Sequence, residues 1–590
     1  MKKIKVGLAF PDYILNDQVK HKRENLSPPN SELLLFVPLI ILGIIFGIIL
    51  MRLLYLQVLR KSYYERLSYE NRTRTETIPA SRGIILDRKG RALVANIPAF
   101  KLVSNDNKVQ FITKEDALAR IADGEKVDND IMREYLYPDI FAHVLGYVGQ
   151  ISEEEMNSPS YQDYSLLDIV GKIGIEKEYE SVLHGQNGRE LHESDAMGKK
   201  IRSLGKEDPE PGKNLTTTLD IDIQKNAYDA MKNVSRGAVV VSDPRDGAIL
   251  SIVSRPAFDT NLFTHPISYE AKGEYVTLDE VLGDTKRMPA LDRAIGGVYP
   301  PGSTFKLITA AAALEEKEMN KDTQVEDTGV IELGGLRFGT WYYLQYGRKE
   351  GKVDMVKAIA RSNDIYFYRA AEKLGDEKLS EWAHNFGLGG KLGIDIAGEE
   401  RGTVPNNEWK IETLGEKWYT GDTFNMGIGQ GYLLTTPLQV NAWTNVFAND
   451  GILYRPHLVV SQKHVLNKNF VSKKNIELIR EGMRQSCATG GVAYTFFNFG
   501  VVNKNLKIDD KDYQKGTSQS ANFVRIPVGC KTGTAQTPGD ENEPHAWITV
   551  FAPYFNPEIS VTVLVEHGGE GSKVAGPIAT EILKKYFERK

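Results

Sequence analysis

Residues 237–254, GAVVVSDPRDGAILSIVS, decide how the second half of this chain folds. Two apolar runs flank a polar segment that contains Asp246-Gly247, which predicts two antiparallel strands joined by a turn. Near the C-terminus, VGCKTGTAQ (528–536), HAWITVFAPY (545–554) and ISVTVLVEH (559–567) also have strand character, and a helix is expected over 576–590. Strands at both ends of a helical middle predict an α+β fold, with an antiparallel sheet closed by distant segments and flanked by helices.

A second decisive stretch is LLLFVPLIILGIIFGIILM, residues 33–51, which contains no charged residue and is long enough to cross a bilayer as a helix. It starts too far from Met1 for a cleaved signal peptide, is too long, and no small-x-small site follows it. We therefore expect one uncleaved transmembrane anchor. Basic residues on both flanks favour a cytoplasmic leader at 1–32 only weakly. Gly43 and Gly47 would let another helix approach, although glycines are common in membrane helices.

Composition excludes several function classes. The net charge of −5 and the absence of a basic stripe argue against nucleic-acid binding. Cys487 and Cys530 allow one internal disulfide but cannot form a zinc cluster by themselves, and the histidines lack ligand spacing. Neither a metal nor a cofactor is expected.

The region between the anchor and the sheet predicts a platform. Its helical start gives way to short strands broken at Gly83 and Gly90, and GKEDPEPGKN (205–214) is typical of a linker. The expected parts are a leader (1–32), an anchor (33–51), an elongated β-rich platform (52–215) and a main domain (216–590). Arg82, Asp87 and Gly90 are expected to form a structural ion pair and turn.

The stretch PPGSTFKLITAAAALEEK, residues 300–317, carries a candidate nucleophile. It predicts a helix that begins near Ser303, with Lys306 on the same face one turn later. A serine hydroxyl becomes a nucleophile when a base takes its proton, and a lysine with a lowered pKa is such a base. The alternative is a helix-capping serine followed by a solvated lysine.

Two further motifs follow in order, Ser362-Asn363-Asp364 and Lys531-Thr532-Gly533-Thr534. Together with Ser303-x-x-Lys306 they resemble the three motifs of the penicillin-binding protein and serine β-lactamase superfamily. ASRGIILDRKGRALVAN, GKIGIEKEYESVLHG, GVYPPGSTFKL, NMGIGQGYLLTTPLQ and PHAWITVFAP are similar to class B penicillin-binding proteins of the cell-elongation, penicillin-binding protein 2 type. The resemblance covers nearly the whole chain after the anchor.

The resemblance implies a peptidoglycan D,D-transpeptidase and a role for each motif residue. Ser303 would be acylated by a D-Ala-D-Ala stem peptide, with Lys306 as base and Lys531 lowering its pKa by like-charge repulsion. Ser362 would relay protons and Asp364 would hold the network. Thr532, Gly533 and Thr534 would bind substrate, and the N–H groups of Ser303 and Thr534 would form the oxyanion hole.

Several residues near these motifs depart from the family pattern or are candidates for other roles. Asp364 stands where most of the superfamily has asparagine, and the elongation subgroup tolerates aspartate at this position. The segment Lys101–Leu136 is shorter than the head region that is usual for this subgroup. Cys530 occupies a position that usually has a small residue, and a buried hydrophobe is favoured there over a redox role. The aromatic residues Trp341, Tyr342 and Tyr346 are favoured as core over site lining, and His545 is not favoured as a base.

The same three motifs also serve other functions. The chain contains no E-x-x-L-N segment of a class A β-lactamase, and a β-lactam sensor carries several membrane spans. A D-Ala-D-Ala carboxypeptidase and a non-enzymatic scaffold of the elongation machinery stay as alternatives, although a scaffold does not need Ser303, Lys306 and Lys531.

The implied partners follow from the resemblance. They are a D-Ala-D-Ala donor peptide, an amine acceptor, β-lactams as inhibitors, a membrane-embedded glycosyltransferase and other elongation-complex proteins. The implied location is the cytoplasmic (inner) membrane, crossed once, with the catalytic domain on the outer, periplasmic side.

Overall fold

The computed structural model describes residues 31–104, 106–162, 164–195, 200–266, 268–460, 463–506, 511–515, 522–536 and 543–590. The expected leader lies outside these residues except for its last two positions. The described chain forms two compact units, one made of residues up to 76 together with 189–207, the other of 77–188 together with 208–590. Each is described separately.

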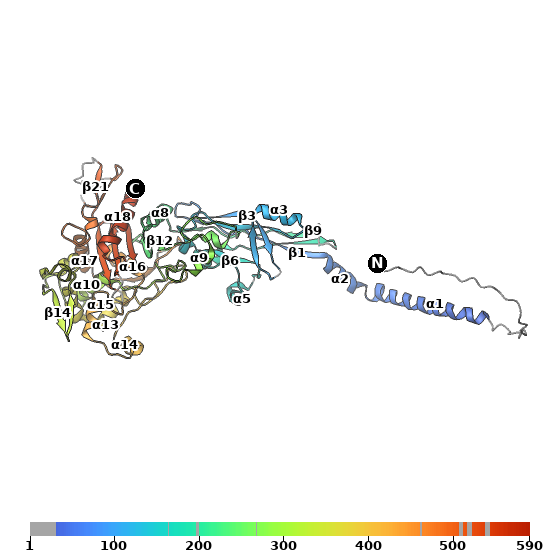
Figure 1. The fold of residues 1–590 in the computed structure, drawn as a ribbon, viewed down its shortest axis with the longest axis horizontal. Coiled ribbons are helices and arrows are strands. Elements are labelled where there is room, and N and C mark those ends of the chain that lie inside the picture. The colour runs from blue at the N-terminus through green and yellow to red at the C-terminus, as the bar shows by residue number, and fades with distance from the viewer. Residues whose placement is uncertain are drawn as a thin grey trace, which may run out of the picture. The chain divides into compact units, whose positions relative to one another are not determined.

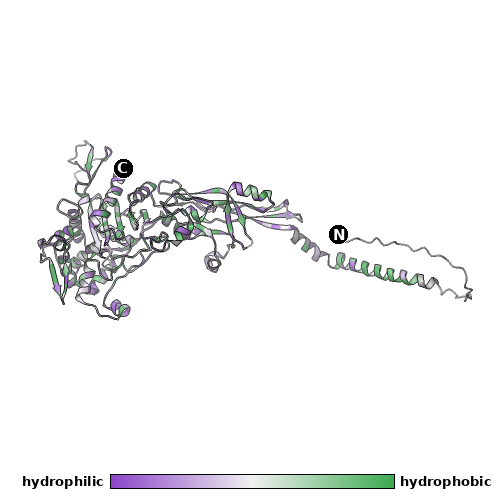
Figure 2. Ribbon diagram, in the orientation of Figure 1, coloured by the Kyte–Doolittle hydropathy of each residue, from purple (hydrophilic) through white to green (hydrophobic). Residues whose placement is uncertain are grey.

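The first unit contains the expected membrane helix. Its elements are α1 (Ser31–Leu54), a π-helical segment (Tyr55–Leu59), α2 (Lys61–Arg72) and the sheet strands β1 (Thr73–Ile78), β8 (Gly188–Ser194) and β9 (Lys200–Glu207), in the order β1-β8-β9. Apolar residues cover every face of α1 (Figure 2), and its side chains from Phe36 onward are exposed. Within the described chain, Phe36–Leu59 is the one segment long and apolar enough to span a membrane.

The second unit begins with the platform elements. These are β2 (Ile85–Leu86), β3 (Val94–Val103), β4 (Val109–Ile112), α3 (Lys114–Ala122), β5 (Asp128–Tyr135), α4 (Ala142–Leu145), β6 (Val148–Gln150), α5 (Glu153–Met156), β7 (Ile169–Gly171), α6 (Gly174–Glu178), α7 (Glu180–Leu183) and β10 (Leu215–Thr216). Strands β4, β3 and β5 form one antiparallel sheet. Part of the expected linker is packed, because a Cβ on Gly212 would lie 1.9 Å from the carbonyl oxygen of Leu183.

The rest of this unit carries the main sheet and its helices. Its helices are α8 (Ile221–Ala230), α9 (Leu278–Gly283), α10 (Lys306–Glu315), α11 (Trp341–Tyr346), α12 (Met355–Arg361), α13 (Asp364–Asn385), α14 (Asn407–Leu414), α15 (Thr420–Gly427), α16 (Pro437–Ala448), α17 (Lys473–Ser486) and α18 (Gly571–Arg589). Its strands are β11 (Gly237–Ser242), β12 (Ile249–Arg255), β13 (Val325–Asp327), β14 (Val330–Leu333), β15 (Leu336–Gly339), β16 (Gly351–Val353), β17 (Ile452–Tyr454), β18 (Val465–Lys468), β19 (Gly500–Val502), β20 (Gln514–Lys515), β21 (Phe523–Arg525), β22 (Gly529–Ala535), β23 (His545–Ala552) and β24 (Ile559–Val565).

The predicted α+β architecture with a sheet built from distant segments is confirmed. The strand order is β12-β11-β24-β23-β22, and every neighbouring pair is antiparallel. The green and red segments of the chain therefore meet in one sheet, beside α18 and α16 (Figure 1). Successive residues of β11 alternate between the two faces: Val239 and Val241 pack in the core that contains α18, whereas Ala238 and Val240 pack in the core that contains α10 and α16.

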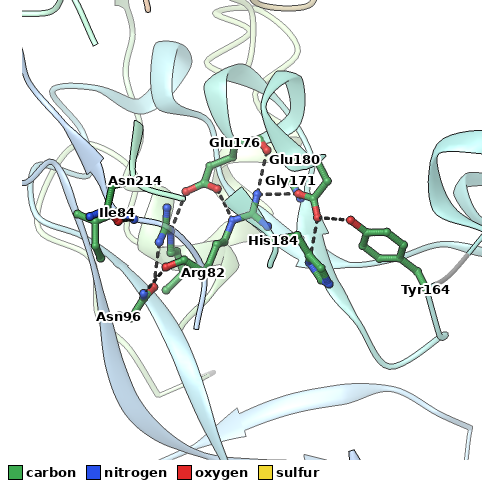
Figure 3. Close-up of polar contacts among 10 residues, drawn as sticks. Arg82, Ile84, Asn96, Tyr164, Gly171, Glu176, Glu180, His184 and Asn214 are labelled. Carbon is green, nitrogen blue, oxygen red and sulfur yellow. Dashed lines mark hydrogen bonds and ion pairs between the residues drawn. The ribbon is translucent and has the colours of Figure 1, made fainter. Parts of the chain in front are cut away.

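A buried charge network joins the platform elements, as Figure 3 shows. Arg82 donates to Glu176 and to Glu180, both at 2.6 Å, and Arg133 donates to Glu176 at 2.8 Å. Burial raises the pKa of Glu180, but the hydrogen bond from His184 and the charge of Arg82 outweigh it and lower this pKa to about 2. The expected structural ion pair is confirmed for Arg82.

The turn expected at Gly90 is also present. Gly90 has a φ of 77°, which favours glycine, and its N–H donates to the carbonyl oxygen of Asp87 at 3.0 Å. The Asp87 carboxylate accepts from the backbone of Lys89 and Arg91 and pairs with the Arg91 guanidinium. These contacts close the turn, so Asp87 and Gly90 have the structural role expected of them.

We expect Glu176→Ala to destabilise the protein by about 3–5 kcal/mol, because it leaves Arg82 and Arg133 buried without their shared carboxylate. Glu178→Ala is the matched control, since Glu178 is exposed on the same helix, α6. Chemical unfolding of the full-length protein in detergent measures both changes. Equal midpoints for the two variants would contradict the network's contribution to stability.

Candidate active site

Ser303 lies in a single 3₁₀ turn, Gly302–Thr304, and not at the first turn of the following α-helix. The expected helix start near Ser303 is wrong by three residues, since α10 begins at Lys306. Gly302 has a φ of 53°, and the Thr304 hydroxyl donates back to the carbonyl of Pro301 at 2.8 Å. These features close a 3₁₀ turn, which is tighter than an α-helical turn, before α10 begins. The Ser303 side chain is half-buried and makes no hydrogen bond among the residues that the structure describes.

Lys306 begins the buried, alanine-rich helix α10 and is itself fully buried. The alternative of a solvated lysine is therefore wrong. Its Nζ donates to Asp364 Oδ1 at 2.6 Å and to the carbonyl of Ser362 at 2.9 Å, with Ser362 Oγ at 3.4 Å. Within the described chain no hydrogen bond joins Lys306 to Ser303, so the amine is held by the second motif.

Ser362 stands between the two lysines. It follows α12 with a φ of 53°, a left-handed conformation that is strained for a residue with a Cβ and often occurs at functional sites. Its Oγ accepts a hydrogen bond from Lys531 Nζ at 2.9 Å. The three motifs thus meet through a chain of contacts from Asp364 to Lys306, Ser362 and Lys531.

Both lysine amines have lowered pKa values. Burial lowers the pKa of Lys306 below its usual value of 10.5, and the charge of Asp364 opposes this shift. Burial and then the neighbouring Lys306 lower the pKa of Lys531 well below 10.5. Burial is therefore the main cause of the lowered pKa of Lys306, whereas the sequence suggested repulsion from Lys531 as its cause. A site with two such amines favours one shared positive charge over two.

The third motif lies on β22, the last strand at its edge of the sheet in the described chain. The carbonyl of Thr534 accepts from Gln430 Nε2 at 3.3 Å, so it points away from β23. In an antiparallel strand the N–H and C=O of one residue point to the same side, which leaves the Thr534 N–H at the free edge. A Cβ on Gly302 would lie 3.0 Å from this carbonyl, so the Ser303 turn and the end of β22 are in direct contact.

The threonines of this strand differ in exposure: Thr532 is buried, whereas Thr534 is exposed. The Thr534 Oγ1 accepts from the backbone N–H of Gly571 at 3.5 Å. Gly533 allows close packing, because a Cβ there would lie 3.0 Å from the Pro301 carbonyl oxygen. Gly533 and Thr534 therefore lie at the junction with the Ser303 turn.

The aromatic residues near the second motif do not form core, contrary to expectation. Trp341 and Tyr342 are half-buried, and Tyr346 is 62% exposed. The Trp341 backbone N–H donates to Asp364 Oδ2 at 3.0 Å, and its indole N–H donates to the Arg361 carbonyl. Trp341 therefore helps to hold Asp364.

Two other residues have clear surroundings. His545 is buried and contacts the rings of Tyr299 and His567. Burial, followed by the charge of His567, lowers its pKa to about 4.

Gln430 was missed by sequence reasoning, although it lies in NMGIGQG, a stretch that carries the family resemblance.

Cys530 is fully buried, as expected, but it is not a free thiol. It forms a disulfide with Cys487, with a Cα–Cα distance of 5.9 Å, which lies in the usual range for disulfides. The bond joins β22, one residue before Lys531, to the C-terminal end of α17.

Comparison with known proteins agrees with this geometry. The penicillin-binding protein transpeptidase domain family matches residues 237–584, and the penicillin-binding protein dimerisation domain family matches residues 117–217. The peptidoglycan D,D-transpeptidase MrdA of Escherichia coli is 32% identical, over 91% of both chains.

Solved structures agree as well. The penicillin-binding protein 2 solved in complex with MreC from Helicobacter pylori has a TM-score of 0.72 and 29% identity, over 88% of this chain and 99% of that one. A chain from a peptidoglycan synthase complex that coordinates polymerization and crosslinking has a TM-score of 0.70 and 28% identity, over 94% and 98%. The chain belongs to the penicillin-binding protein family, and within it to the class B, penicillin-binding protein 2 type.

Proposed function

We propose that this chain is a serine D,D-transpeptidase that cross-links peptidoglycan stem peptides during cell-wall elongation, with Ser303 as the acylated nucleophile. The observation that carries this proposal is the arrangement behind Ser303, in which two buried lysines of lowered pKa share Ser362 as a hydrogen-bond partner. Structural lysines are seldom buried in pairs, because each charge costs desolvation free energy. Such a pair is suited to moving a proton.

In the first half-reaction, Ser303 Oγ attacks the carbonyl between the two D-alanines of a donor peptide. Neutral Lys306 accepts the hydroxyl proton, the ester bond forms, and the C–N bond to the terminal D-Ala breaks. The path from Lys306 through Ser362 Oγ to Lys531 carries the proton toward the leaving amine. Asp364 holds Lys306 in place, and the Trp341 N–H in turn holds Asp364.

In the second half-reaction, an amine from a neighbouring stem peptide attacks the ester and releases Ser303. The N–H groups of Ser303 and Thr534 stabilise the negative oxygen in both steps, because each donor is fixed before the reaction begins. The substrate carboxylate binds the hydroxyls of Thr532 and Thr534, and Gly533 leaves room for the peptide to approach the strand.

We assign residues 52–215 to a platform and 216–590 to the transpeptidase domain, anchored in the cytoplasmic membrane by the helix that contains residues 33–51. The Cys487–Cys530 disulfide supports an outer, periplasmic position for the catalytic domain, because disulfides persist outside the reducing cytoplasm.

Partners follow from this position and from the relatives. A membrane-embedded glycosyltransferase supplies the glycan strands and contacts α1, where a Cβ on Gly43 or Gly47 would have no atom of the described residues within 4 Å. The relatives solved with MreC and in a synthase complex support elongation-complex partners. β-Lactams, which resemble the donor peptide, acylate Ser303.

The test uses the full-length protein in detergent with a D-alanyl thioester as donor and a D-amino acid as acceptor, followed by mass spectrometry of the products. Formation of the donor–acceptor amide is expected of a transpeptidase. Release of the hydrolysed acid alone would identify a carboxypeptidase. Unchanged donor, together with no penicillin adduct on the protein, would favour the scaffold.

A further inference from the structure

The strand that carries Lys531 has only one strand neighbour. β22 pairs with β23, and its other edge has no strand partner in the described residues. Edge strands open more easily than central ones because half of their backbone groups lack ladder partners. Lys531 nevertheless has to keep its Nζ within 2.9 Å of Ser362 Oγ, which belongs to a different element. Something has to hold the strand from its free side.

Helix α17 packs against β22 and reaches the second motif directly. A Cβ on Gly482 of α17 would lie 2.7 Å from Ile359 of α12, so the two helices pack in close contact. Arg361, the last residue of α12, donates to the carbonyl of Gly490 at 3.0 Å, three residues after Cys487. The end of α17 is thus fastened to the helix that Ser362 follows.

The disulfide connects the third motif to the second motif by a second route. It links Cys530 to Cys487 at the end of α17, and α17 packs on α12. Ser362 directly follows α12 and accepts a hydrogen bond from Lys531, the residue next to Cys530. Both sulfurs are buried with Phe496 and Val528 in the same core, so the link is shielded from solvent.

We propose that the Cys487–Cys530 disulfide is a positioning element for the transpeptidase reaction: it holds the strand of the third motif at the distance from the second motif that the Lys531–Ser362 hydrogen bond needs. This inference rests on the role proposed for Lys531. Without the bond, the edge strand separates from α17, and Lys531 moves away from Ser362 toward water.

The test compares four samples of the full-length protein in detergent: the oxidised wild type, the wild type reduced with a phosphine under native conditions until thiol alkylation and mass spectrometry show that the bond is broken, the same sample reoxidised, and Cys487→Ala/Cys530→Ala. The rate of acylation by a fluorescent penicillin is measured as a function of pH. A displacement of about 1 Å in a catalytic group costs up to about a hundredfold in rate, so the reduced and the double-variant proteins should acylate about ten- to a hundredfold more slowly. Reoxidation should restore the rate of the wild type, and the phosphine should not affect the double variant.

The pH profile separates positioning from a loss of stability. If Lys531 moves toward water, it regains a pKa nearer 10.5, so the alkaline limb of the profile, where Lys531 loses the proton that it passes toward the leaving nitrogen, shifts to higher pH. Hydrogen exchange over 529–535 should become faster on reduction, while exchange in the central strand β24 stays unchanged. The native reduction keeps the test valid if the double variant folds poorly.

Two results would overturn the proposal. One is a reduced protein with the wild-type rate and pH profile, even if its melting temperature falls, since the disulfide would then be only a structural cross-link. The other is equal exchange over 529–535 in the oxidised and reduced forms. If even the oxidised wild type is not acylated, the proposed function fails, and hydrogen exchange alone decides whether the disulfide holds the strand.

Discussion

Full-length Ser303→Ala is expected to form no covalent adduct with benzylpenicillin, whereas the wild-type chain gains the mass of one drug molecule. Ser303 is the only residue that the proposal assigns as nucleophile, so its loss removes acylation entirely. The substitution should leave the fold intact, because the Ser303 hydroxyl makes no hydrogen bond in the described residues and the turn around it is closed by Gly302 and Thr304. Intact-mass spectrometry of both proteins after the same incubation measures this directly.

Ser472→Ala is the matched control for this experiment. Ser472 is exposed before α17 and makes no side-chain capping hydrogen bond, so its substitution should leave the adduct unchanged. An adduct of equal mass on Ser303→Ala would show that another residue is acylated and would contradict the assignment. Disappearance of intact drug without any adduct on the wild type would indicate rapid deacylation, as in a β-lactamase.

The sequence predicts the architecture of this enzyme well, because strong local patterns determine it. The apolar runs over 237–254 and 559–567 reappear as β11, β12 and β24, whose successive side chains enter two different cores. The sequence also predicts the apolar anchor, which depends only on length and composition.

The local geometry of the site was harder to predict, because it depends on contacts between distant segments. PPGS is typical of a helix start, but the positive φ of Gly302 is set by the packing of its turn against Thr534 and Gly429, each more than a hundred residues away. The same holds for Lys306: a face shared with Ser303 suggested a direct contact, whereas the amine pairs with Asp364.

The disulfide and Gln430 show the limit of sequence reasoning most clearly. Two cysteines allow one bond, but 43 residues of separation do not bring them together. Only the packing of α17 against β22 does so. Gln430 contacts Thr534 from a turn that no local pattern relates to the third motif.

Lys306→Met is expected to slow acylation by about 10²- to 10⁴-fold, which is the range for removing a general base. Methionine has nearly the length of lysine and suits the buried position, so the site keeps its volume but loses the amine. The wild-type rate should rise with pH as the amine loses its proton. Because burial lowers the pKa of Lys306, this rise should lie below the usual lysine range near 10.5. The residual rate of the variant should lack this limb.

Lys378→Met controls for the loss of a lysine elsewhere, since Lys378 makes partly exposed ion pairs with Glu316 and Glu318. Its acylation rate should equal that of the wild type. Melting temperatures distinguish a loss of catalysis from a loss of folding. Lys306→Met leaves the Asp364 carboxylate with the Trp341 N–H as its remaining hydrogen-bond donor among the described residues, so some loss of stability is expected. A variant that acylates at the wild-type rate with the same pH dependence would exclude Lys306 as the base. It would transfer that role to Lys531, whose amine pKa is also lowered by burial and which also contacts Ser362.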